Sequence, residues 1–220
     1  MSIAIKTTND PKIAAEFIAG KILDQLKNGK NVFWLVPGGS AIAVAVLASK
    51  IIAKYPHENL TVTLTDERYG EVFHKDSNLL QMLDSGFDLP QAKLLSVLAG
   101  ADRVMTTEKF NTIIGDGFKN TDYQIGLFGV GADGHTAGIL PESAAVEAPN
   151  WATSYVAQKF ERVTVTFKTI ENLNEAVVWA QGKEKWEVIK DMTEKEIDVK
   201  KQPAQILKKV PALTIFTDKK

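Results

Sequence analysis

Asp133 and His135 stand two residues apart in the glycine-rich stretch GVGADGHTAGILPES, which spans residues 129–143 and follows the apolar run YQIGLF. A carboxylate close to an imidazole can fix the tautomer of the ring and raise its basicity, which suits a general base. Glycine in an ordered loop costs conformational entropy, and buried Asp and His side chains cost desolvation unless they have partners. The stretch therefore indicates a binding or catalytic loop.

A lone histidine is more often structural than catalytic, so the three histidines of the chain must be compared. His57 lies in KYPHENL, which reads as a surface turn, and His74 lies in a polar stretch. Only His135 is flanked by glycines at the end of a predicted strand. One such histidine with scattered carboxylates makes a weak metal site, so we expect no metal.

A second glycine-rich turn, PGGS, follows the apolar run NVFWLV and opens a predicted helix. Backbone N–H groups of Gly38 and Gly39 and the hydroxyl of Ser40 suit an anion there, because a helix N-terminus favours negative charge. A tight strand-to-helix turn is the simpler alternative. The turn matches neither the nucleotide-binding phosphate loop nor the dinucleotide fingerprint.

A third polar loop, TDER, places Asp66, Glu67 and Arg68 at the end of the predicted strand LTVTL. A surface turn with an internal ion pair is common and stabilises a protein little. The position at a strand end nevertheless favours a functional role.

The elements that position these loops alternate between strand and helix along the whole chain. Helices are expected over 11–26, 41–55, 102–118 and 183–192, and a short one is expected over 169–176, capped by Thr169. Apolar runs between them read as strands, and SYVAQK and RVTVTF are further strand candidates. This order predicts a single α/β domain over residues 1–220, Rossmann-like, with a mostly parallel sheet and helices on both faces. Ligands of such sheets bind at the carboxyl ends of the strands, where all three loops would meet.

Composition narrows the function classes. A formal net charge of -1 gives no support for binding to nucleic acid or to an anionic membrane, although a local patch could hold a small anion. The absence of cysteine excludes disulfides and thiolate nucleophiles. No signal peptide or apolar run long enough to span a bilayer is present, so we expect a cytoplasmic protein.

The motifs VPGGS, TDER followed by DSN, and GVGADGHTAGILP occur in the order seen in 6-phosphogluconolactonases, which this chain resembles over nearly its whole length. RVTVTF with TIENLNEA, AQGKEKWEVI and the final ALTIFTD fit the same family. The resemblance implies hydrolysis of 6-phospho-D-glucono-1,5-lactone to 6-phosphogluconate in the oxidative pentose phosphate pathway, without a cofactor, by a monomer or small homo-oligomer.

In that reaction His135 is expected to act as general base for a water molecule, with Asp133 orienting either His135 or the site. Asp66 is expected to hold sugar hydroxyls or to organise Arg68. The residues expected to bind the phosphate are Gly38, Gly39, Ser40, Arg68, Arg162 and Lys183. For Arg162 and Lys183, the simpler alternative is that they are surface charges without a role in binding.

Two other functions stay open. The wider superfamily contains glucosamine-6-phosphate deaminases, but these resemble Asp-Glu-Tyr where this chain has Asp66-Glu67-Arg68, and Glu142 does not occupy the place of their additional acid. A non-catalytic sugar-phosphate sensor of the same fold would carry a DNA-binding segment, for which the first residues are expected to leave no room. Departures from the lactonase pattern include Ala41 after Ser40 and the tail KKQPAQILKKVPALTIF.

Overall fold

The apolar runs of the sequence form a seven-stranded sheet in the computed structural model, which describes residues 2–219. Neighbouring strands are parallel throughout, in the order β1-β10-β9-β6-β2-β3-β5. The strands are β1 (Ser2–Thr7), β10 (Ala212–Thr217), β9 (Glu175–Ala180), β6 (Tyr123–Gly129), β2 (Val32–Val36), β3 (Leu60–Leu64) and β5 (Lys93–Leu95). The predicted α/β class with a mostly parallel sheet is confirmed.

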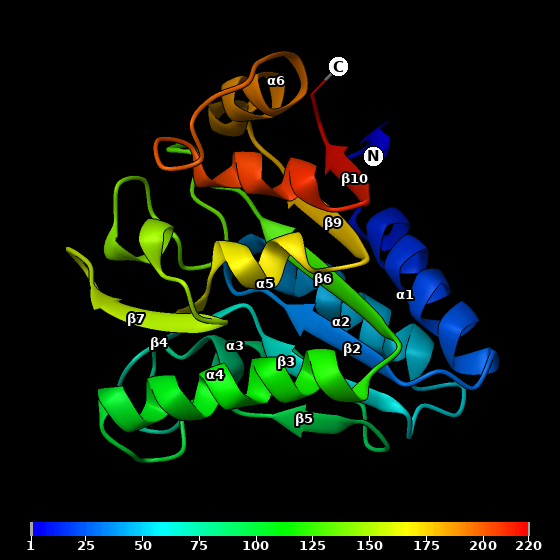
Figure 1. The fold of residues 1–220 in the computed structure, drawn as a ribbon. Helices are drawn as coiled ribbons and strands as arrows, with labels where there is room; N and C mark the ends of the chain where they lie inside the picture. Colours follow the sequence, from blue (N-terminus) through cyan, green and yellow to red (C-terminus); the bar gives the residue numbers. More distant parts are fainter. Residues whose placement is uncertain (1, 220) are drawn as a thin grey trace.

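Helices cover both faces of this sheet. Figure 1 shows α4 and α5 in front of the sheet and α2 behind it, and α1 packs along α2. The helices are α1 (Pro11–Lys27), α2 (Ile42–Ile52), α3 (Asn78–Asp84), α4 (Arg103–Asn120), α5 (Phe167–Glu171) and α6 (Trp186–Glu194). Short 3-10 segments are η1 (Gly39–Ala41), η2 (Ala144–Glu147), η3 (Lys183–Lys185) and η4 (Pro203–Lys209). Among residues 2–219, none of these helices is both long and apolar enough to cross a bilayer.

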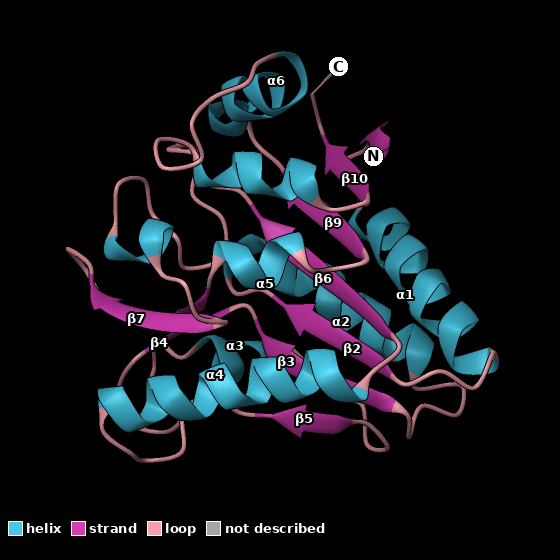
Figure 2. Cartoon of the chain, in the orientation of Figure 1, coloured by secondary structure: helices cyan, strands magenta, loops and turns pink. Residues whose placement is uncertain are grey.

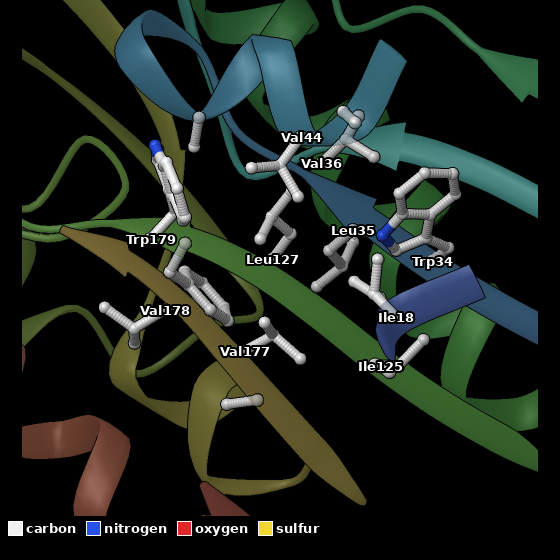
Figure 3. Packing of buried hydrophobic residues seen from close by; sticks show 14 of the residues in the cluster. Ile18, Trp34, Leu35, Val36, Val44, Ile125, Leu127, Val177, Val178 and Trp179 are labelled. Atoms are coloured by element: carbon white, nitrogen blue, oxygen red, sulfur yellow. The ribbon is translucent and has the colours of Figure 1, made fainter. Parts of the chain in front are cut away.

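The central strands are buried on both faces, as near-continuous apolar sequence predicts for a covered parallel sheet. All five residues of β2 and all six of β9 are buried. Figure 3 shows side chains of β2, β6 and β9 in one cluster with Ile18 of α1 and Val44 of α2. This packed core fixes the strand ends from which the polar loops emerge.

A second, three-stranded antiparallel sheet joins β4 (Asp66–Arg68), β8 (Glu161–Val165) and β7 (Ala152–Val156), in the order β4-β8-β7. Figure 2 shows β7 outside the main sheet. SYVAQK and RVTVTF therefore are strands, as predicted, but they pair with each other and with TDER. The pairing of Arg68 with Arg162 across β4 and β8 brings a distant cation to the loop after β3.

Two local expectations were wrong or incomplete. The helix expected over 169–176 is Phe167–Glu171, with Thr166 at its N-cap, and the Thr169 hydroxyl donates instead to the Trp151 carbonyl. Strand β1 was not predicted, because Ile3 and Ile5 lie exposed at the sheet edge in a short segment with weak turn signals.

Substitution of Gly117 by alanine tests the tight packing of α4 on the sheet. An added Cβ would lie 2.3 Å from a ring carbon of the buried Phe33. We expect Gly117→Ala to destabilise the protein by about 1–3 kcal/mol through overpacking. Gly20, which is exposed in α1 with nothing within 4 Å of an added Cβ, is the matched control.

Gly20→Ala should stabilise the protein by about 1 kcal/mol, since alanine favours a helix over glycine. Urea unfolding of both variants measures the difference. Stabilisation by both substitutions would contradict the packing of Gly117 against Phe33.

Candidate active site

The three predicted loops meet at the carboxyl ends of β2, β3 and β6, whose arrowheads point to the left side of the sheet in Figure 1. They surround a cavity of about 310 Å³. The cavity is lined by Pro37, Gly38, Gly39, Ser40, Asp66, Arg68, Asn78, Gly129, Val130, Gly131, His135, Arg162 and Lys185. The structure therefore brings seven of the nine predicted site residues together, all except Asp133 and Lys183.

Asp133 contacts His135 but does not line the cavity. Its Oδ1 is 2.6 Å from His135 Nδ1 and also accepts the backbone N–H of His135 at 3.1 Å. The hydrogen bond from His135 holds the pKa of the Asp133 carboxyl below its usual range, and partial burial opposes this shift. Because the ionised carboxylate can only accept, the ring donates through Nδ1, and among residues 2–219 no hydrogen bond engages Nε2.

The loop that carries this pair requires its glycines. A Cβ on Gly131 would lie 2.2 Å from His135 Nδ1 and 2.5 Å from Asp133 Oδ1. Gly134 adopts the left-handed conformation, with φ of 82°, and accepts a backbone hydrogen bond of 2.8 Å from Ala204 at the start of η4. The loop is thus a tight turn over residues 131–135, and η4, the segment before β10, is hydrogen-bonded to it.

Asp66 lies buried beside the cavity, only 5% exposed. Its Oδ1 accepts a hydrogen bond from the Thr65 hydroxyl at 3.2 Å, and its Oδ2 lies 3.6 Å from Arg162 Nη1. The cation paired with Asp66 is therefore Arg162 from β8. A surface location for Arg162 is wrong, because its side chain is only 15% exposed.

Arg68 is held by the loop between β4 and α3. Its Nη1 donates to the Asp76 carbonyl at 2.8 Å, and its guanidinium lies 5.2 Å from the centre of the Phe160 ring. His74 stabilises the same loop, because its Nε2 lies 2.9 Å from the Arg68 carbonyl oxygen. These contacts orient the guanidinium along the cavity wall.

Glu67 is fully buried, so the simpler alternative of a surface turn at TDER is wrong for this residue. Its carboxylate accepts backbone N–H groups from Arg68, Asn78 and Leu79 and the hydroxyl of Ser77. Burial raises the pKa of the Glu67 carboxyl, and these four hydrogen bonds oppose the shift. Glu67 thus ties β4 to the N-terminus of α3 and fixes its neighbours Asp66 and Arg68.

Glycine is required at position 38 because Asn78 approaches its backbone closely, and at position 39 because the backbone is left-handed. A Cβ on Gly38 would lie 2.1 Å from Asn78 Oδ1, and Gly39 has a φ of 65°. No side chain caps η1, which continues into α2. Backbone N–H groups at such a helix start favour an anion.

The turn after β9 contributes Lys185 to the cavity, not the predicted Lys183. Lys183 is exposed and does not line the cavity, whereas Lys185 is half-buried and does. Sequence reasoning chose the lysine next to Gly182 and missed the one two residues later. Asn78 was also missed, although it lies in the DSN motif; its Nδ2 donates to the Asp66 carbonyl at 2.9 Å.

The cavity therefore combines three cationic side chains, a glycine-rich helix start and a histidine with a free ring nitrogen. Cations and N–H groups attract a phosphate, and the imidazole can accept a proton from water. Within residues 2–219, no group of three or more His, Asp or Glu side chains is arranged to hold a metal ion.

Residues 11–215 match the family model described as glucosamine-6-phosphate isomerases/6-phosphogluconolactonase. A 6-phosphogluconolactonase from Synechocystis sp. is 26% identical over 163 residues, which cover 69% of this chain and 68% of the relative.

Solved structures of both activities share the fold. A 6-phosphogluconolactonase from Thermotoga maritima has a TM-score of 0.81 at 21% identity, covering 98% of this chain and 99% of that chain. A monomeric glucosamine-6-phosphate deaminase has a TM-score of 0.80 at 18% identity, covering 99% and 97%. The fold alone therefore does not separate the two activities. Because the family model matches most of its length, the chain belongs to the glucosamine-6-phosphate isomerase/6-phosphogluconolactonase family.

Proposed function

We propose that this protein hydrolyses 6-phospho-D-glucono-1,5-lactone to 6-phosphogluconate, the lactone-opening step of the oxidative pentose phosphate pathway. The observation that carries the proposal is the Asp133–His135 pair, whose histidine borders a cavity with three cationic side chains. The similarity to the Synechocystis 6-phosphogluconolactonase supports it.

His135 acts as the general base. With Nδ1 bound to Asp133, Nε2 takes a proton from a water molecule as the water oxygen attacks the lactone carbonyl carbon. The bond from this carbon to the ring oxygen then breaks, and the ring oxygen receives the proton from His135. The Asp133 carboxylate stabilises the imidazolium that forms between these steps.

Cations of the cavity bind the phosphate and offset the charge of the tetrahedral oxyanion. Arg68 and Arg162 offer planar guanidinium groups, Lys185 offers a point charge, and the turn Gly38–Ser40 offers backbone N–H groups. Asp66 neutralises part of the charge of Arg162 and keeps a carboxylate at the cavity wall for sugar hydroxyls.

Deamination of an amino-sugar phosphate is the second candidate, because a deaminase shares this fold. Such a reaction would need an additional acid next to the histidine loop. Glu142 does not meet this need: it is exposed, and its backbone N–H donates to the Lys200 carbonyl outside the cavity. This position favours the lactonase.

The activity is tested with 6-phosphogluconolactone made in situ from glucose 6-phosphate, with hydrolysis followed above its spontaneous rate. We expect His135→Ala to lower kcat about a hundredfold to ten-thousandfold, because general base catalysis is lost. Circular dichroism and thermal unfolding verify that the variant is folded. Ammonia release from glucosamine 6-phosphate is measured in parallel.

Undiminished hydrolysis by His135→Ala would retain the substrate and overturn the role of the histidine. Ammonia release by the wild type without lactone hydrolysis would establish the deaminase instead. If neither reaction is accelerated, binding of 6-phosphogluconate tests the remaining alternative, a non-catalytic sugar-phosphate-binding protein.

Gly131→Ala tests the geometry of the Asp133–His135 pair. The added methyl group would overlap the His135 ring, so the ring must move, and we expect a loss of about a hundredfold in kcat. Gly129→Ala is the matched control, since nothing lies within 4 Å of an added Cβ on this cavity residue. Equal activity of the two variants would refute the fixed geometry.

Lys185→Ala and Lys183→Ala form a second matched pair. Loss of a charged contact to phosphate should raise the KM of the lactone about tenfold to a hundredfold in Lys185→Ala. Lys183→Ala removes an equal charge outside the cavity and should change KM less than about twofold. A larger increase in KM for Lys183→Ala than for Lys185→Ala in steady-state kinetics would identify Lys183 as the phosphate ligand.

A further inference from the structure

Asp218, directly after β10, makes three hydrogen bonds to the turn that carries Lys185. Its Oδ1 accepts the indole N–H of Trp186 at 2.9 Å. The backbone N–H of Gly182 donates to both carboxylate oxygens, at 3.1 Å and 3.3 Å. All these contacts go to residues that flank the Lys183–Lys185 segment, one on each side.

Within the turn itself, the backbone N–H of Lys185 donates to the Gly182 carbonyl at 3.0 Å. Gly182 at its start has a φ of 103°, and η3 has no side-chain cap. One side-chain hydrogen bond, from Gln181 Nε2 to the Phe216 carbonyl at 3.2 Å, joins the preceding residue to β10. The carboxylate of Asp218 therefore is the main link between this turn and the sheet.

Lys185 depends on such a link because its own side chain is flexible. A lysine carries its charge on a long stem with several rotatable bonds, so its position at the cavity is set by the backbone below it. Among residues 2–219, no carboxylate lies within ion-pair distance of Lys185. Its charge acts on the Asp218 carboxylate from beyond that distance, and it can meet an anion in the cavity.

We propose that Asp218 is a positioning residue for phosphate binding: by holding Gly182 and Trp186, it aims Lys185 into the cavity. The proposal rests on the proposed function, in which Lys185 binds the phosphate of the lactone. The hydrogen bond from Trp186 holds the pKa of the Asp218 carboxyl below its usual range, so this acceptor stays ionised at neutral pH.

Binding of 6-phosphogluconate, measured by calorimetry, tests the proposal whether or not the lactone is hydrolysed. We expect Asp218→Ala to weaken binding about tenfold, with kcat for the lactone changed less than about twofold. Asp218→Asn, which keeps an acceptor for the indole, should lose less. Glu187→Ala, which removes an exposed charge from α6 without touching the turn, should bind like the wild type.

A double-mutant cycle separates positioning from general stability. If Asp218 acts through Lys185, Asp218→Ala should have no further effect on binding in a Lys185→Ala background. A readout that requires no catalysis is the indole ¹⁵N–¹H signal of Trp186, assigned by its loss in Trp186→Phe. This signal should shift when 6-phosphogluconate is added to the wild type, and not in Lys185→Ala.

Additive losses in the cycle, or a fall in kcat with unchanged binding, would overturn the positioning role. Absence of 6-phosphogluconate binding by the folded wild type would overturn it too. Failure of the proposed function looks different, because a protein that binds 6-phosphogluconate through Lys185 but leaves the lactone unhydrolysed would retain the role of Asp218.

Discussion

The hydrogen bond between Asp133 and His135 is the constraint around which the site is arranged. It spans two residues of one turn, and it exists only because Gly131 leaves room for the ring and the carboxylate. The same turn needs the left-handed backbone of Gly134 and the hydrogen bond from η4. A pair made from such close neighbours needs little side-chain ordering, because the main chain already fixes both groups.

The parallel sheet turns this local pair into a site by adding charge from distant segments. Its strands end at one edge, so the loops after β2, β3, β6 and β9 converge there. The antiparallel sheet then brings in Arg162, which pairs with the buried Asp66. Burial of this carboxylate is tolerable because the cation and the Thr65 hydroxyl are within reach. The seven-stranded sheet thus positions the backbone of the loops, and the three-stranded sheet supplies the cation that pairs with Asp66.

Long, strongly patterned elements and glycine-marked loops could be predicted from the sequence, because burial and backbone conformation leave local signals. The fold class and most of the cavity wall followed from them. Partners that depend on tertiary contact could not be predicted. Glu67 resembles a surface charge until α3 covers it, and β1 lacks a buried pattern because its isoleucines face solvent. Lys183 and Lys185 are equivalent in sequence, and only the turn of η3 decides which one faces the cavity.

The cavity also has a consequence for how the molecule reaches its native state. Its walls come from residues as far apart as Pro37 and Lys185, and β9, which leads to Lys185, pairs with the last strand, β10. Contacts of such high sequence separation close late and slowly, because the chain must lose loop entropy before they form. No short fragment contains the whole pocket. The rate at which ligand binding recovers during refolding would therefore report the assembly of the whole sheet rather than the formation of any one helix.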